Sequence, residues 1–377
     1  MHLELSDQEL SWQTEWRNFA TEVLAPASEE MDRTARLPDH LLASLRDRRI
    51  LQPFLPVELG GQGLELFHLT LLVEELGRQS PVVAWLAAQQ VVIGIRTNLA
   101  CFNVPDHRDL ARQAANLEAI CSLAATEPEA GCDLGALTTT SRRRDDGQYE
   151  VSGGKAYVNW AGRARWLVTL TKAEGEGGQG STMLLIRLPS PQVKIGEVHA
   201  TLGMNGLEAA PVVFERQVVP ASHVAGVAGF GHDLYDRMVN ELRICVAAIA
   251  TGLGQQVFDD AAHHAKSRKQ FGRPIGSFQS LQWRFSDAAL KVDAARLHVW
   301  QAVELAGAKG SCFQQAAMAK IFATEAAFWV ADFGMQAMGS KAYVRPSRVE
   351  RLFRDARFLK IALGTSEILR NKIAERL

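Results

Sequence analysis

Six apolar residues in the C-terminal part of the chain recur at alternating spacings of four and three positions: Leu281, Phe285, Ala288, Val292, Ala295 and Val299. This spacing places all six on one face of an α-helix, as in the seam of a packed helix bundle. The same spacing occurs earlier, at Leu242, Val246, Ile249 and Leu253. Two long neighbouring helices are therefore expected, and residues 226–377 are predicted to form a helical bundle.

The N-terminal part of the chain also has a helical pattern. Ser6 and Glu9 form a capping box ahead of an amphipathic segment, which Pro26 is expected to end. Further helical patterns, separated by Pro and Gly, occur at 41–45, 69–76 and 82–95. Residues 1–118 are predicted to form a helical domain.

Between these two regions the pattern becomes that of β-structure. Short runs rich in β-branched and aromatic residues occur at 138–140, 149–151, 166–170, 183–188 and 212–214. The segments 145–147 and 174–180 are natural hairpin turns. Residues 119–225 are therefore predicted to form an antiparallel β domain, and the fold class is α+β.

Composition excludes several classes of function. The 377 residues include 41 Lys and Arg against 42 Asp and Glu, so no basic excess favours nucleic-acid binding. Charged residues make up only 22% of the chain and hydrophobic residues 47%, which argues against disorder. The five cysteines are an odd number without a C-x-x-C pair, so neither disulfides nor structural zinc are expected.

The chain also lacks the patterns of a secreted or membrane protein. Its N-terminus has no basic start followed by an apolar core. The longest apolar stretch, 82–95, is interrupted by Gln89 and Gln90 and is shorter than the about 20 residues that span a bilayer. A cytoplasmic location without membrane contact is therefore expected.

Common motifs of nucleotide binding, nucleophilic catalysis and metal binding give no assignment. The glycines of 60–63 lack a strand–turn–helix context, so we interpret them as a turn. His263 and His264 point about 100° apart on a helix and do not favour one metal. Cys132 has no histidine nearby in the sequence, so a packed or hydrogen-bonding thiol is the better interpretation. No metal site is expected.

Six segments together resemble the acyl-CoA dehydrogenase flavoprotein family, in the family's order. Each motif alone is weak, but the spacing of the set is specific. The segments are PVELGGQG at 56–63 with EELGR at 74–78, TEPEAGCD at 126–133, GKAYVN at 154–159, RKQFGRPI at 268–275 with Gln279, RDAR at 354–357, and GTSEILR at 364–370.

The resemblance implies a helical domain, a central β-barrel-like domain and a C-terminal four-helix bundle, assembled as a homodimer or homotetramer. It also implies FAD at a subunit interface, with Thr126 at the pyrimidine edge, Tyr157 and Asn159 beside the ring, and Arg268 from the neighbouring subunit at the pyrophosphate. The full set implied for FAD is Leu123, Thr126, Cys132, Tyr157, Asn159, Arg268, Phe271, Gln279, Gln336, Gly339, Thr365 and Glu367.

The catalytic base of the family is missing at both positions that the resemblance indicates. The family reaction removes a weakly acidic α-proton from an acyl thioester, which requires a carboxylate with raised proton affinity. Most members carry Glu where this chain has Leu363, and a minority where it has Leu242. Glu241 adjoins Leu242 and is the candidate for a relocated base, although one residue along a helix rotates the side chain by about 100°.

Substrate contacts are implied for Asn240, Arg243, Leu363 and Gly364. Three hypotheses follow. The first is an FAD oxidoreductase acting on an acyl thioester of coenzyme A or a carrier protein by non-standard chemistry, with electron-transfer flavoprotein or oxygen as acceptor. The second is a non-catalytic partner subunit of a heteromeric dehydrogenase. The third is a flavin-dependent monooxygenase on the same fold.

Overall fold

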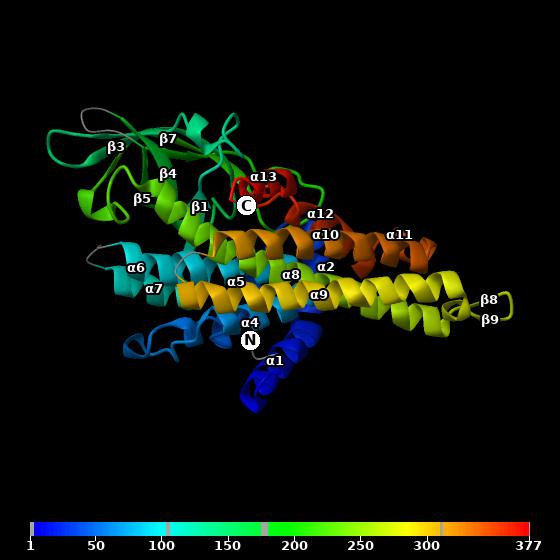
Figure 1. The fold of residues 1–377 in the computed structure, drawn as a ribbon. Helices are drawn as coiled ribbons and strands as arrows, with labels where there is room; N and C mark the ends of the chain where they lie inside the picture. Colours follow the sequence, from blue (N-terminus) through cyan, green and yellow to red (C-terminus); the bar gives the residue numbers. More distant parts are fainter. Residues whose placement is uncertain (1–3, 103–105, 175–179, 310–311, 377) are drawn as a thin grey trace.

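The computed structural model describes residues 4–102, 106–174, 180–309 and 312–376. Helices from both ends of the sequence pack side by side as a bundle, and the β-sheet lies against one end of these helices (Figure 1). The C-terminal helix α13 (Ser366–Ala374) lies near the sheet, while the hairpin of β8 (Lys269–Gln270) and β9 (Arg273–Pro274) lies at the opposite end of the long helices (Figure 1).

Every regular element in the described part of the N-terminal region is a helix. Its first helix begins at the predicted capping box, in which Glu9 N donates to Ser6 Oγ and Ser6 N donates to Glu9 Oε2. The elements are α1 Asp7–Phe19, η1 Ala20–Leu24, α2 Ala25–Thr34, α3 Asp39–Asp47, η2 Gln52–Phe54, η3 Val57–Leu59, α4 Leu66–Gln79, α5 Pro81–Gln89, η4 Gln90–Thr97, α6 Asn98–Cys101 and α7 His107–Ala115.

The prediction that Pro26 ends the first helix is wrong. The chain continues from α1 through the π-helical turn η1 into α2, and Pro26 lies in the first turn of α2. The π-helical turn before Pro26 shifts the hydrogen-bond pattern from i−4 to i−5, as in the bond from Ala25 N–H to Ala20 O, so the missing N–H of Pro26 falls where the α-helical ladder is already interrupted.

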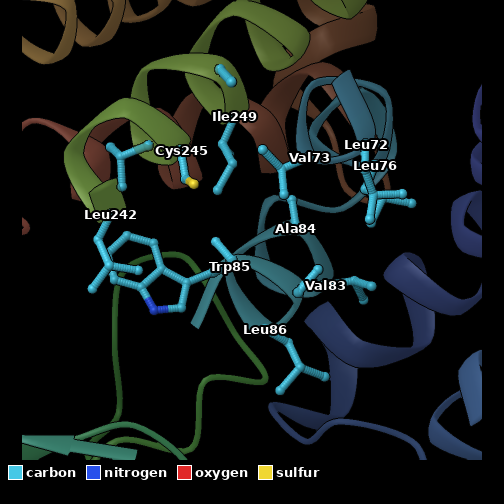
Figure 2. Close-up of a cluster of buried hydrophobic side chains, with 14 of the residues drawn as sticks. Leu72, Val73, Leu76, Val83, Ala84, Trp85, Leu86, Leu242, Cys245 and Ile249 are labelled. Carbon is cyan, nitrogen blue, oxygen red and sulfur yellow. The ribbon is translucent and has the colours of Figure 1, made fainter. Parts of the chain in front are cut away.

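The apolar segment around 82–95 is longer as a helix than its sequence pattern indicated. The continuous helical run Pro81–Cys101 has 21 residues and is apolar enough to cross a bilayer by length and composition alone. However, 89% of its apolar window is buried inside the fold, as expected of a core helix. Figure 2 shows Ala84 and Trp85 of this run facing residues of α4 and of α8 (Gly231–Ser267).

The middle region forms one seven-stranded sheet in the order β1-β4-β2-β3-β7-β6, with β5 paired to β4. The prediction of an antiparallel domain holds for most pairs but is wrong for two, because β1 and β2 each pair with β4 in parallel. The strands are β1 Ile120–Ala124, β2 Thr140–Arg143, β3 Tyr149–Val158, β4 Ala164–Glu174, β5 Ser181–Arg187, β6 Val193–Ile195 and β7 Ala210–Val219.

The predicted hairpin turn at 145–147 is confirmed. Arg144 N donates to Gln148 O at 2.8 Å, and Gly147 adopts φ 81°, which glycine accommodates without strain. The other predicted turn, 174–180, lies mostly outside the described residues. Of the predicted run 138–140, only Thr140 belongs to a strand.

The C-terminal region contains the long helices α8 Gly231–Ser267, α9 Gln279–Lys309 and α10 Phe313–Met338, with α11 Ser340–Tyr343, α12 Arg348–Leu359 and α13 Ser366–Ala374 after them. The short hairpin β8 Lys269–Gln270 and β9 Arg273–Pro274 joins α8 to α9. The predicted face of α9 is confirmed, because its last four apolar positions are buried and its first two are partly buried against the core.

Helix α8 also packs closely on α4 of the N-terminal region. A Cβ atom at Gly252 would lie 1.9 Å from Glu74 O, and one at Gly77 would lie 2.8 Å from Ile249 O. The two helices can therefore cross at this distance only because both positions are glycine. Figure 2 shows Val73 of α4 and Ile249 of α8 in the apolar cluster beside this crossing. Through this contact α8 is fixed relative to the helical run that follows α4.

Candidate functional site

A cavity of ≈ 470 Å³ lies where the helices meet the sheet. Its walls come from the run Pro81–Cys101, the segments after β1 and within β3, the loop before β7, helix α8, and the turn between α12 and α13. Segments distant in the sequence therefore converge on one concave site, which is where ligand sites are usually found.

Both positions implied for a catalytic base line this cavity. Leu242 projects from α8 and is 4% exposed, and Leu363 lies in the turn between α12 and α13. Leu363 has φ 56°, a left-handed conformation that costs a non-glycine residue roughly 1–2 kcal/mol. Such strain persists only where surrounding contacts hold the backbone in place.

Two buried cations hold this turn by its backbone carbonyl groups. Arg243 Nε donates to Leu363 O at 2.9 Å, while Lys320 Nζ donates to Lys360 O at 2.9 Å and to Gly364 O at 2.8 Å. Lys360 is the C-cap of α12, so the Lys320 ammonium also lies at the negative end of that helix dipole. These bonds fix the carbonyl groups on both sides of Leu363.

Neither cation has a carboxylate ion-pair partner within the described part of the chain. Arg243 Nη1 donates to Asn240 Oδ1 at 2.7 Å, so these two predicted substrate-contact residues are bonded to each other beside the cavity rather than in its wall. Burial lowers the pKa of Arg243. For Lys320, burial and then repulsion by Arg243 lower the pKa to about 7. Lys320 therefore titrates near neutral pH.

Glu241 does not line the cavity. Its carboxylate accepts two hydrogen bonds from Arg96, at 2.8 and 3.0 Å, on a face of α8 about 100° from that of Leu242. Among the described cavity-lining residues the one carboxylate is Glu208, and it is already bonded to Arg163 Nε and to the backbone N–H of Leu37. The geometry therefore places no free carboxylate beside Leu242 and Leu363.

Half of the residues implied for FAD meet at the cavity: Leu123, Thr126, Cys132, Tyr157, Asn159 and Thr365. Tyr157 is 62% exposed and packs beside the ring of His199, at 5.1 Å between centroids. Within the described residues, the Thr126 hydroxyl and the Asn159 carboxamide have no hydrogen-bond partner. An exposed aromatic face beside unpaired donors and acceptors fits the polar edge and flat face of a flavin ring.

The remaining implied FAD residues lie elsewhere, and all are exposed: Arg268, Phe271, Gln279, Gln336, Gly339 and Glu367. Arg268 follows Leu242 by 26 residues, which is about 39 Å along α8 at 1.5 Å per residue. Phe271, at the tip of the β8–β9 hairpin, is 92% exposed. One chain therefore does not bring the whole set to the cavity. The assignment of these residues to FAD stays a prediction.

Three further cavity residues were not predicted from the sequence. Trp85 and Gln89 come from the Pro81–Cys101 run, and Tyr235 lies two helical turns before Leu242 on the same face of α8. Burial raises the pKa of Tyr235 to about 12, so its phenol keeps its proton. Gln89 interrupts an otherwise apolar run, and this signal could have identified it.

Family models match nearly the entire chain. The N-terminal domain of acyl-CoA dehydrogenase matches residues 6–101, the middle domain 122–217 and the C-terminal domain 229–377.

Individual relatives align with this chain over nearly their full length. The chain is 32% identical to 3-sulfinopropanoyl-CoA desulfinase of Paraburkholderia xenovorans, covering 99% of this chain and 97% of the relative. It is 31% identical to benzylmalonyl-CoA dehydrogenase of Aromatoleum aromaticum, covering 100% of both. The structure of butyryl-CoA dehydrogenase from Megasphaera elsdenii superposes with a TM-score of 0.94 at 25% identity, covering 100% of this chain and 99% of that one.

Proposed function

This chain belongs to the acyl-CoA dehydrogenase family of FAD-dependent oxidoreductases, and from that premise we propose that it acts on an acyl thioester without a carboxylate base. The thioester is carried by coenzyme A or by a carrier protein. The observation that carries the proposal is that Leu242 and Leu363 line one cavity, at the two positions where the resemblance implies the base of the family. Leucine can neither accept a proton nor hydrogen-bond.

The loss of the base restricts the chemistry that the site can perform. Without a base, removal of a weakly acidic α-proton is slow. Three kinds of substrate do not need a carboxylate base: one whose α-hydrogen is acidic enough to be lost to a weaker base, one that is reduced, and one that rearranges or loses a group from the acyl chain. The name of the desulfinase relative denotes a reaction on a CoA thioester other than dehydrogenation, which supports this restriction.

The residues of the site have separate roles in this proposal. FAD, when bound, supplies a hydride acceptor or donor. Thr126 and Asn159 would hold the polar edge of the flavin ring, and Tyr157 would cover its face. The backbone N–H of Leu363 has no acceptor among the described residues, so it is free to bind the thioester carbonyl oxygen. Arg243 and Lys320 orient that N–H by holding the neighbouring carbonyl groups.

The proposal includes assembly of identical chains. The exposed end of α8 with Arg268 lies far from the cavity, so a second copy would have to bring this end to the flavin. Large apolar side chains on α9 are exposed at intervals of seven: Trp283 at 62%, Leu290 at 69% and Leu297 at 46%. Such a stripe on one helix face is typical of a surface that another subunit covers.

The test uses FAD-loaded protein mixed anaerobically with thioesters while flavin absorbance is followed. Butyryl-CoA represents ordinary dehydrogenation, and acyl thioesters with an acidified α-hydrogen or a β-leaving group represent the alternatives. We expect no rapid bleaching with butyryl-CoA, and turnover with at least one member of the second set by mass spectrometry. Fast bleaching by butyryl-CoA, or no reaction with any thioester, would contradict the proposal.

A further inference from the structure

The inner wall of the cavity contains a polar pair that none of the roles above uses. Trp85, Gln89 and Ile93 lie four residues apart on one face of the Pro81–Cys101 run, and all three line the cavity. The Trp85 ring packs edge-on against Phe358, at 5.3 Å between centroids, and lies beside Leu242 (Figure 2). This wall is therefore adjacent to a base position and otherwise apolar.

The orientation of the Gln89 carboxamide is determined by its one hydrogen bond. Gln89 is 3% exposed, and its Nε2 donates to Cys121 O at 2.9 Å. A carbonyl oxygen only accepts hydrogen bonds, so the nitrogen of the amide must face Cys121. The next residue, Gln90, differs because both of its amide atoms bind the Cys121 backbone.

The Gln89 oxygen is left as an acceptor that faces open space. Gln89 Oε1 has no partner among the described residues, and it is not one of their fully buried unpaired atoms. The Trp85 indole N–H also has no partner among the described residues and is not fully buried. The indole N–H groups that are both unpaired and fully buried belong to Trp12, Trp16 and Trp300. The open space that both Trp85 and Gln89 border is the cavity.

We propose that the acyl group of the substrate carries a hydroxyl or carboxamide group, which donates to Gln89 Oε1 and accepts from Trp85 Nε1. Each of these groups donates and accepts at once, and so matches both partners. An alkyl group would leave a nearly buried acceptor unpaired, which is costly. A carboxylate would face the Gln89 oxygen with a second acceptor, and an ammonium group would have no acceptor for the indole N–H. The inference rests on the proposed function, because it requires a thioester in this cavity.

The experiment measures binding rather than turnover. Pantetheine thioesters are suitable probes, because coenzyme A and carrier proteins share the pantetheine arm. FAD-loaded protein is titrated calorimetrically with 3-, 4- and 5-hydroxyacyl thioesters, each paired with an analogue in which methyl replaces the hydroxyl. At least one hydroxyacyl probe is expected to bind about tenfold tighter than its methyl analogue.

Two variants separate hydrogen bonding from cavity shape. Gln89→Met keeps the length of the side chain but removes the acceptor, and Gln90 still binds Cys121 O, so β1 keeps that partner. Ile93→Val changes the same wall without changing a polar group. The preference for hydroxyl should disappear in Gln89→Met and persist in Ile93→Val.

The outcomes separate failure of this inference from failure of the proposed function. Equal binding of hydroxyl and methyl probes by the unmodified protein would overturn the inference while leaving the proposed function intact. A preference that survives in Gln89→Met would also overturn it. Failure of every thioester to bind would overturn the proposed function, and the inference with it.

Discussion

The side chain of Glu241 shows how one residue of displacement along a helix changes a role. Its neighbour Leu242 faces the cavity, while Glu241 points away and forms a bidentate pair with Arg96. Side chains of adjacent helical residues point about 100° apart, so both cannot face the same space. The hypothesis of Glu241 as a relocated base therefore has no geometric support.

Substitution of Glu241 should leave the chemistry nearly unchanged. For Glu241→Gln we expect kcat within about twofold of the unmodified protein. Loss of the partly exposed ion pair should cost about 0–1 kcal/mol of unfolding free energy. Steady-state rates with any substrate found above, and denaturant titration, check both values. A kcat reduced by two orders of magnitude in a folded, FAD-loaded variant would identify Glu241 as the base.

At the scale of single residues, the sequence predicted which residues lie at the site better than it predicted which residues bind one another. The motif ending at residue 370 placed Leu363 at the site, and the structure indeed puts it in the cavity wall. By contrast, Lys320 lies in an alanine-rich helix and binds carbonyl groups some 40 residues later. No local pattern specifies such a partner, because the contact exists only once α10 packs beside α12.

The turn between α12 and α13 is the element that shapes the reacting end of the cavity. Lys320 supports it, so Lys320→Met should remove donors from two carbonyl groups and destabilise the fold by roughly 1–3 kcal/mol. Lys266→Met, an exposed change on α8, is the matched control and should have little effect on stability. Denaturant titration measures both.

The effect of Lys320 should also depend on pH. Its pKa is about 7 in the folded chain, against 10.5 for an ordinary lysine. Between these values the unfolded chain binds more protons, so the contribution of Lys320 to the unfolding free energy increases with pH. The stability difference between the unmodified protein and Lys320→Met should therefore grow between pH 7 and pH 9, by at most about 1.4 kcal/mol per pH unit. A stability difference that stays constant over this pH range would show that the pKa of Lys320 is not lowered in the folded chain.

Local sequence patterns predicted where helices and strands occur more reliably than they predicted which strands pair and in which direction. The apolar face of α9 follows from spacing alone, because a helix converts spacing directly into a face. The parallel pairing of β1 with β4 joins Ile120 to Ala164 across more than 40 residues and depends on the whole sheet. The prediction for Pro26 failed for a related reason: a proline usually ends a helix, but here a π-helical turn directly precedes it, and no local sequence pattern indicated that turn.

At the scale of the whole molecule, Arg268 and Phe271, both implied for FAD, lie far from the cavity that contains Thr126 and Tyr157. This separation leads to the expectation that a neighbouring chain completes each flavin site. Arg268→Ala should weaken FAD binding roughly 10- to 100-fold, because a charge-assisted hydrogen bond to phosphate is lost.

Arg273→Ala is the matched control for this change. Arg273 lies in the same hairpin, but its guanidinium lies over the ring of Phe278 of its own chain, with 4.3 Å between Cζ and the ring centroid. It should therefore affect FAD affinity much less than Arg268→Ala does. Fluorescence titration of the apoprotein with FAD, with the mass of the assembly measured alongside, checks the expectation. Equal FAD affinity in Arg268→Ala and the unmodified protein would show that Arg268 does not contact the cofactor.

The most direct measurement compares the unmodified protein with Leu363→Glu. Residue 363 is already left-handed and faces the cavity, so glutamate can replace leucine there without a change of backbone. Both FAD-loaded proteins are mixed anaerobically with butyryl-CoA while flavin absorbance is recorded. We predict slow or no bleaching in the unmodified protein and bleaching at least 100-fold faster in Leu363→Glu. Rapid bleaching of the unmodified protein would contradict the account, because the protein would then contain a base at a position other than 242 and 363.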